Sequence, residues 1–383
     1  MVAGIAAAAV AVFVVALTGW GTAQAETSRS RFQSGIDDLH RHGIVGVQGV
    51  VRDGVRTERA RSGVADLHTG GKVSYDSYFR MGSNTKTFVA TVALQLVGEG
   101  KLSLQDTVDH WLPGVVHGRG NDGKKVTVRE LLQHTSGLPE YSDDFAALTS
   151  VPGYRQHRFD HVSAAAMVAA AMRHKPDFRP GTSWNYSNTN YILIGMIIER
   201  VTGQPWSAEV QQRILNPLHL RHTFAPEDWP YLPRPYAHQY QQYAIGGPLL
   251  DTTIMNMTLA GAAGELVTTS SDLARFWQAL QGGKVLAPRQ MAEMHHTVLA
   301  VTEQEFLPGL RYGLGIMWLP SRCGGYWFHD GDVLGGATRN GVSNDGRRAV
   351  VISENTESAD NTTLIDNLLR INRLVTKELC RTN

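Results

Sequence analysis

The chain has 383 residues, of which 42% are hydrophobic and 19% are charged, and its formal net charge is +1. This balance is typical of a globular protein with one large domain or two smaller ones. A net charge this close to zero gives no field that would attract nucleic acid or an acidic surface, so no nucleic-acid partner is expected.

The first 25 residues have the pattern of a secretory signal peptide. An apolar run over 5–17 is followed by Ala23-Gln24-Ala25, a small-x-small cleavage site. A run this short is a poor membrane span. We therefore expect a secreted protein with no stable membrane anchor, whose mature chain covers 26–383. No Lys or Arg precedes the run, which leaves a retained N-terminal segment or a wrongly assigned start as alternatives.

Strand patterns lie toward both ends of the chain, and helical patterns lie between them. The expected strands are 44–51, 56–64, 312–319, 326–329, 337–342 and 347–354. The expected helices are 31–42, 83–97, 128–134, 163–172, 190–201, 207–215 and 359–379, whereas 218–247 indicates irregular loop. We therefore predict an α/β protein with one antiparallel sheet built from both chain ends (about 26–82 and 272–383), flanked by helices, and an inserted, mostly helical subdomain (about 83–271). The crevice between the two parts is the expected site.

One short motif has the residues for nucleophilic catalysis. Ser83 and Lys86 are three residues apart at the start of a predicted buried helix, so their side chains lie on one face. Ser83 would lie beside the positive end of the helix, and a neutral lysine one turn later could take its proton. By itself the pattern is weak, because a serine in this place could simply cap the helix.

Two later motifs strengthen this interpretation. Tyr-Ser-Asn at 186–188 stands just before a predicted helix, and His-Asp-Gly at 329–331 ends a predicted strand. Another His-x-Gly, at 68–70, precedes the serine and lies in a predicted turn, so we interpret it as a loop. The order Ser-x-x-Lys, Tyr-x-Asn, His-x-Gly makes it improbable that the tyrosine is only a buried aromatic residue.

With these motifs in this order, the chain resembles the serine β-lactamase and penicillin-binding-protein superfamily. The resemblance is to the branch of class C β-lactamases and secreted D-alanyl-D-alanine carboxypeptidases, peptidase family S12. The segments 79–86, 95–102, 134–138, 186–190 and 312–315 contribute to it. It covers essentially the whole mature chain and implies a β-lactamase/transpeptidase-like fold.

The resemblance implies a mechanism through an acyl-enzyme. Ser83 would attack a carbonyl while Lys86 is neutral, and Tyr186 would act as base toward Ser83 or pass the proton to the leaving group. Asn188 would orient Lys86 and the substrate amide. Burial would lower the pKa of Lys86, and a cationic His329 would help. How Lys86 and Tyr186 share the proton stays open.

The third motif and the residue that follows it are expected to bind substrate through Asp330, Gly331 and Asp332. The backbone N–H groups of Ser83 and Asp332 would form the oxyanion hole.

The third motif also departs from the family pattern. Carboxypeptidases of this branch have His-Thr-Gly-Thr and a nearby Arg, which hold the substrate carboxylate. This chain has Asp330 and Asp332 in place of the two hydroxyls, and Met317 at the Arg position. An ionised Asp about 4 Å from a substrate carboxylate would repel it by roughly 1–4 kcal/mol. Arg339 could compensate. Alternatively, Asp330 points into solvent and Asp332 acts only through its backbone.

Three functions therefore stay open. The first is a secreted D-alanyl-D-alanine carboxypeptidase-like hydrolase that acts on peptidoglycan stem peptides. The second is an esterase, or an amidase for D-amino-acid amides or peptides with a free amine that pairs with Asp330 or Asp332. The third is a penicillin-recognising protein that is acylated but barely turns over. β-Lactamase activity is less expected, because no motif reveals a deacylating water. β-Lactams are expected as covalent inhibitors, and the protein is expected to be a monomer.

The two cysteines, Cys323 and Cys380, predict one disulfide, because their number is even in an exported chain. It would contribute about 4 kcal/mol by the chain-entropy estimate and attach the C-terminal helix to the body. Two buried free thiols are the alternative. The chain has no Cys-x-x-Cys and no His-Glu-x-x-His, so we expect neither a metal nor a cofactor.

Overall fold

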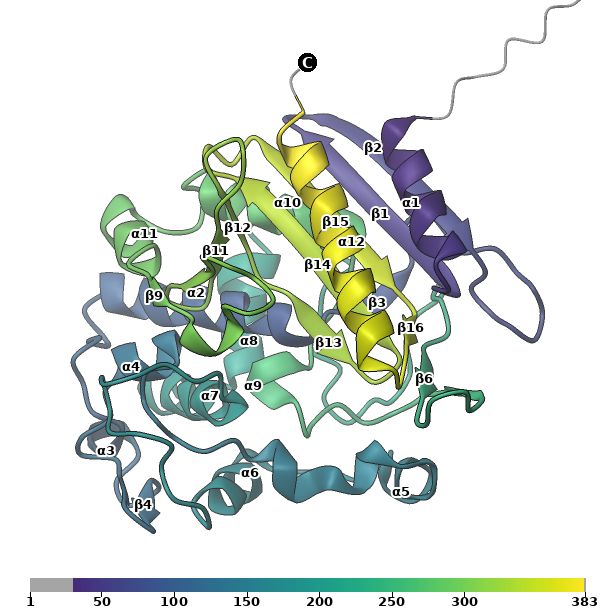
Figure 1. Cartoon of the computed structure of the whole chain (residues 1–383). Helices are drawn as coiled ribbons and strands as arrows, with labels where there is room; N and C mark the ends of the chain where they lie inside the picture. The colour runs from purple at the N-terminus through teal and green to yellow at the C-terminus, as the bar shows by residue number, and fades with distance from the viewer. Residues whose placement is uncertain (1–29, 382–383) are drawn as a thin grey trace, which may run out of the picture.

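The central sheet is assembled from both ends of the chain (Figure 1). The computed structural model describes residues 30–381, and the expected signal peptide lies outside them. The strand order is β2-β1-β15-β14-β12-β11-β10-β9, with β13 also paired to β14. These strands are β1 (Gly46–Asp53), β2 (Arg56–Gly63), β9 (Val298–Leu299), β10 (Arg311–Tyr312), β11 (Met317–Leu319), β12 (Tyr326–Phe328), β13 (Gly331–Val333), β14 (Gly336–Ser343) and β15 (Arg348–Glu354). All pairings in this sheet are antiparallel, so the expected α/β sheet is confirmed.

Helices cover both faces of this sheet. On one face, α1 (Arg31–Arg41) and α12 (Asn361–Leu379) lie side by side (Figure 1). The first helix buries Phe32, Ile36 and Leu39 at the spacing of an amphipathic helix. On the other face lie α10 (Ser270–Gln281) and α2 (Thr85–Gly98). The second of these is apolar almost all round and buried on all sides, as a helix in the centre of a large core must be.

A mostly helical part fills the middle of the chain, as predicted. Its helices are α3 (Val108–Trp111), α4 (Val128–Gln133), α5 (Val151–His157), α6 (Ala164–Ala171), α7 (Asn188–Thr202), α8 (Trp206–Val210) and α9 (Gly261–Gly264), and α11 (Pro288–Met294) follows α10. Short turns of other helix types are η1 (Gly82–Asn84), η2 (Ser142–Thr149), η3 (Gln211–Leu215) and η4 (Val301–Glu303). Small strand pairs complete it: β3 (Tyr78–Arg80) with β8 (Val267–Thr269), and β4 (His117–Gly118) with β5 (Asn121–Asp122).

Two expectations about strands were wrong. The segment 218–247 is not all loop, because it contains β6 (Tyr240–Gln242), which pairs with β7 (Leu249–Asp251) and with β16 (Thr356–Glu357) near the other end of the chain. The run 312–319 is not one strand, because a turn divides it into β10 and β11. Within that turn Gly315 has φ of +76°, and a Cβ there would lie 2.3 Å from the Cβ of Ala90 on α2. Glycine is needed here both for the backbone angle and for the close approach.

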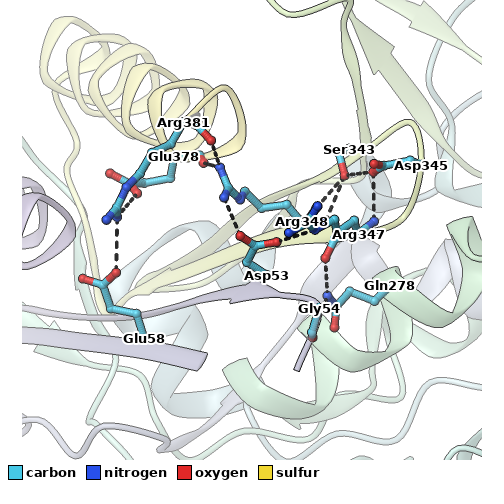
Figure 2. Close-up of polar contacts among 10 residues, drawn as sticks. All are labelled: Asp53, Gly54, Glu58, Gln278, Ser343, Asp345, Arg347, Arg348, Glu378 and Arg381. Carbon is cyan, nitrogen blue, oxygen red and sulfur yellow. Dashed lines mark hydrogen bonds and ion pairs between the residues drawn. The ribbon is translucent and has the colours of Figure 1, made fainter. Parts of the chain in front are cut away.

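The C-terminal helix is fixed to the sheet by a disulfide and by ion pairs. Cys323 and Cys380 are joined, as predicted. Nearby, Asp53 at the end of β1 accepts from Arg348 at 2.6 Å, and Arg348 also donates to the backbone oxygens of Glu378 and Arg381 (Figure 2). The end of α12 is therefore attached to β1 and β15 on the far side of the molecule from the helical part.

No helix within residues 30–381 is both long enough and apolar enough to cross a membrane.

Candidate active site

The Ser83 side chain lies at the start of the buried helix, as the motif predicts. The turn η1 leads directly into α2, so Ser83 and Lys86 lie on successive turns. Lys86 is completely buried. Its Nζ lies 2.9 Å from Ser83 Oγ, 2.7 Å from Asn188 Oδ1 and 2.8 Å from the backbone oxygen of Ala263. The lysine thus brings the first two motifs together, because it bonds both Ser83 and Asn188.

Burial lowers the pKa of Lys86 to about 7, and the nearby carboxylate of Glu140 opposes this shift. The expectation that a cationic His329 helps to lower it was wrong. His329 is itself completely buried, and burial together with the Lys86 charge lowers its pKa to about 3. His329 is therefore a neutral imidazole, and desolvation alone accounts for the lowered pKa of the lysine.

Tyr186 lies beside both Ser83 and Lys86. The Lys86 Nζ lies 4.8 Å from the centre of its ring, and the phenol is near enough to the Ser83 hydroxyl for that hydroxyl to influence its pKa. Burial raises the pKa of Tyr186 well above its usual value, although the Ser83 hydroxyl opposes the shift. Tyr186 therefore keeps its proton at neutral pH.

The third motif lies against the turn that contains the nucleophile. Gly82 has φ of +53°, and a Cβ there would lie 2.8 Å from the backbone nitrogen of Asp332 on β13. A buried amide locks this arrangement, because Asn340 Nδ2 donates to Asn84 Oδ1 at 2.6 Å and to the backbone oxygen of His329 at 2.7 Å. The backbone of β13 is thus held directly beside Ser83.

The two unexpected carboxylates share one arginine. Arg339 Nη2 lies 2.6 Å from Asp332 Oδ1, and its Nε lies 3.7 Å from Asp330 Oδ2. The alternative in which Asp330 points into solvent was wrong, because its side chain is only 15% exposed whereas that of Asp332 is 62% exposed. Burial raises the pKa of Asp330 to about 7 despite the Arg339 charge. Arg339 is thus paired with both carboxylates.

A cavity of about 280 Å³ opens beside Ser83. Its lining is Gly82, Ser83, Tyr141, Ser142, Leu148, Asn188, Met255, Asn256, Met257, Leu259, Ala260, Ala263, Gly264, Asp332, Val333 and Leu334. This set contains no Arg, Lys or His, and Asp332 is its one ionisable side chain apart from the phenol of Tyr141. Met317, at the position where the resemblance to carboxypeptidases leads us to expect Arg, is a partly buried residue that packs against the apolar core and does not line the cavity.

Sequence reasoning missed two residues that shape this site. Glu140 Oε2 accepts from the backbone nitrogen of Asn188 at 2.5 Å, and Asn340 joins two motifs. Arg339 was noted only as a possible partner. Glu140 follows the recognised segment 134–138 by two residues, which is the one signal that could have pointed to it.

The sequence family described as Beta-lactamase matches residues 25–372. The chain belongs to the β-lactamase family. It is thereby a serine hydrolase of the group that includes the penicillin-binding proteins. Curated relatives in this family are the protein flp of Staphylococcus aureus strain COL, 34% identical over 38% of this chain, and the putative penicillin-binding protein PbpX of Bacillus subtilis strain 168, 25% identical over 84% of this chain. The match covers 27% of flp and 73% of PbpX.

Solved structures of the same fold include enzymes that act on amides. A D-stereospecific amidohydrolase from a Streptomyces species is 38% identical, with a TM-score of 0.82 over 92% of this chain and 98% of that one. A D-amino acid amidase from Ochrobactrum anthropi SV3, solved with L-phenylalanine amide, is 27% identical, with a TM-score of 0.75 over 89% of this chain and 97% of that one. Both structures are similar to this chain over nearly their whole lengths.

Proposed function

We propose that this protein is an acyl-enzyme-forming amidase that hydrolyses amides of D-amino acids with a free α-amino group and an apolar side chain. The observation that supports this most directly is the charge of the Ser83 cavity, where Asp332 supplies a carboxylate and no lining residue supplies a cation. The rest of the lining is rich in apolar residues, among them Leu148, Met257 and Leu334, which suit an apolar side chain. The D-configuration is taken from the two amide hydrolases to which the chain is similar.

The first chemical step follows from the environment of Lys86. A neutral amine has two N–H bonds and one lone pair. Since Asn188 Oδ1 and the backbone oxygen of Ala263 accept the two N–H groups, the lone pair faces Ser83 Oγ. Lys86 would therefore take the Ser83 proton as Oγ bonds to the substrate carbonyl carbon. The negative charge on the carbonyl oxygen would be stabilised by the N–H groups of Ser83 and Asp332.

The C–N bond then breaks, and the leaving nitrogen needs a proton. Because Tyr186 is protonated at neutral pH, we assign it the role of donor, with the proton held by Lys86 restoring the phenol. Ammonia or an amine leaves, and the acyl group stays on Ser83. Water would then attack the ester and release the D-amino acid, with its proton returning to Ser83 through the same groups.

Electrostatics favours an ammonium over a carboxylate in this cavity. The Arg339 guanidinium is already shared by Asp330 and Asp332, so it is not free to bind a substrate carboxylate. A carboxypeptidase for D-alanyl-D-alanine peptides, the function predicted first, would need such a cation. The amidase proposal needs only that the exposed Asp332 carboxylate reach the α-ammonium group.

We also propose that the protein is secreted, which the disulfide between Cys323 and Cys380 supports.

The test compares D-phenylalanine amide with its N-acetyl derivative, using the wild type and Asp332→Asn. We expect the wild type to prefer the free amine, and the variant to lose about fivefold to tenfold in kcat/KM on it, the equivalent of roughly 1 kcal/mol for a partly solvated charge pair. Hydrolysis of the acetylated amide should change little. Asp366→Asn is the matched control, since Asp366 is also a half-exposed carboxylate paired with an arginine, but on α12. If Asp332→Asn leaves the preference unchanged, the proposed recognition of the amine is wrong.

A further inference from the structure

A buried chain of hydrogen bonds runs from the helical part to the sheet directly behind Tyr186. His134, at the end of α4, lies 3.1 Å through Nε2 from the Tyr312 hydroxyl on β10. The same hydroxyl lies 2.9 Å from Nε2 of His329, the histidine of the third motif. All three side chains are buried. His134 and Tyr312 open two of the recognised segments, and the proposed reaction gives neither residue a role.

At His134, contacts with the backbone fix the direction in which these hydrogen bonds are donated. Nδ1 of His134 lies 3.2 Å from the backbone nitrogen of Ser187, and a backbone N–H can only donate. Asn190 Nδ2 also donates to this atom, at 3.0 Å, while its Oδ1 accepts from Ser136 at 2.6 Å. Nδ1 is therefore the acceptor, and the proton of the neutral ring must be on Nε2. His134 thus donates to the Tyr312 oxygen.

The backbone also fixes the direction at the other end. Nδ1 of His329 lies 2.7 Å from the backbone oxygen of Asp330, and a carbonyl oxygen can only accept. His329 therefore has its proton on Nδ1, and its Nε2 is the acceptor for the Tyr312 hydroxyl. Every donor along the chain has one acceptor. The arrangement requires both imidazoles to be neutral, and burial lowers the pKa of each.

The rings of this chain surround the ring of Tyr186. The His134 ring is 4.3 Å from it, centre to centre, and inclined by 33°. The rings of Tyr312 and His329 lie 6.3 and 6.2 Å away. The backbone nitrogen of Ser187, the residue after Tyr186, donates to His134. His134 therefore holds both the backbone next to Tyr186 and the ring of Tyr186. At the other end of the hydrogen-bonded series, His329 is followed in the sequence by Asp330 and β13.

We propose that His134 and Tyr312 are positioning residues, which set the place of the Tyr186 phenol and the register of the third motif against Ser83. Through them the two walls of the site, one from each part of the fold, are joined by a single hydrogen-bond pattern. The proposal rests on Ser83 being the nucleophile and not on the identity of the substrate.

The first test is spectroscopic and needs no substrate. In the ¹⁵N-histidine-labelled wild type at neutral pH, long-range ¹H–¹⁵N spectra should show His329 neutral with its proton on Nδ1, and His134 neutral with its proton on Nε2. His134→Gln and His329→Gln variants assign the signals. The opposite tautomer for either ring, or a charged ring, would overturn the proposal.

The second test is kinetic and uses p-nitrophenyl acetate, a small acyl donor that lacks the amine recognised by Asp332. Tyr312→Phe removes one hydroxyl and should lower the acylation rate constant about tenfold, the loss typical of one buried hydrogen bond, with less than a twofold change in apparent binding. The control is Tyr326→Phe, which should change neither. Tyr326 is a buried tyrosine on β12, which β11 separates from β10, and it takes no part in these hydrogen bonds. Equal effects of the two substitutions, or a loss confined to binding, would show that Tyr312 acts only in packing.

Discussion

The burial of Lys86 determines how the rate of Ser83 acylation should depend on pH. Only the deprotonated amine can take the serine proton, so the rate rises with pH through the lysine pKa and then levels off. With a pKa of about 7, roughly one tenth of the enzyme is competent at pH 6 and nine tenths at pH 8, a gain of about tenfold. A lysine with its usual pKa near 10.5 would instead give about a hundredfold over the same interval, and the rate would continue to rise above pH 8.

The variant Glu140→Gln moves this profile in a defined direction. The Glu140 carboxylate raises the pKa of Lys86, so its removal should shift the midpoint to lower pH and raise the rate at pH 6 relative to that at pH 8. Glutamine keeps an oxygen that can accept from the backbone nitrogen of Asn188, the bond that Glu140 makes at 2.5 Å. The site geometry is therefore retained while the charge is lost.

The assay is the pre-steady-state burst of p-nitrophenyl acetate between pH 5.5 and 9. Asp330→Asn is the control, because burial also raises the pKa of Asp330 to about 7. A midpoint that persists in Asp330→Asn and falls in Glu140→Gln belongs to Lys86. A profile that rises steadily to pH 9, or a midpoint that vanishes in Asp330→Asn, would refute the assignment of Lys86 as the neutral base.

Two further predictions concern stability. Arg339→Met removes the cation shared by Asp330 and Asp332 and should lower the free energy of unfolding by about 3–5 kcal/mol at pH 8. The loss should shrink toward pH 5.5, because Asp330 is then protonated. Equal losses at both pH values, measured by chemical denaturation, would contradict this. Replacing Cys323 and Cys380 by Ser should lower the free energy of unfolding by about 2–4 kcal/mol, seen as a lower melting temperature, whereas an unchanged melting curve would mean that the disulfide adds nothing.

The parts of the fold that depend on local patterns could be predicted from the sequence. The spacing of Ser83 and Lys86, the apolar helix after them and the Tyr186 motif before α7 are all short-range signals, and the structure brings them together. The division into a sheet from both chain ends and a helical middle was also readable, because strand and helix patterns are segregated along the chain.

What could not be predicted depends on contacts between distant segments. The charge state of His329 follows from complete burial and from its bond to Tyr312, neither of which a strand pattern reveals. The inward turn of Asp330 follows from Arg339 on the paired strand β14. Likewise, β6 pairs on one side with β16, more than a hundred residues away. In each case the decisive partner lies on another strand, which a local pattern does not reveal.

The most direct test of the proposed function is a paired measurement of kcat/KM on the wild type, with D-phenylalanine amide and an N-acyl-D-alanyl-D-alanine peptide as the two substrates. Ser83→Ala is the control that should abolish both activities. A preference for the amide would agree with a cavity that presents the Asp332 carboxylate and no free cation. A preference for the peptide with its terminal carboxylate would contradict the account and return the protein to the carboxypeptidases that its motifs first suggested.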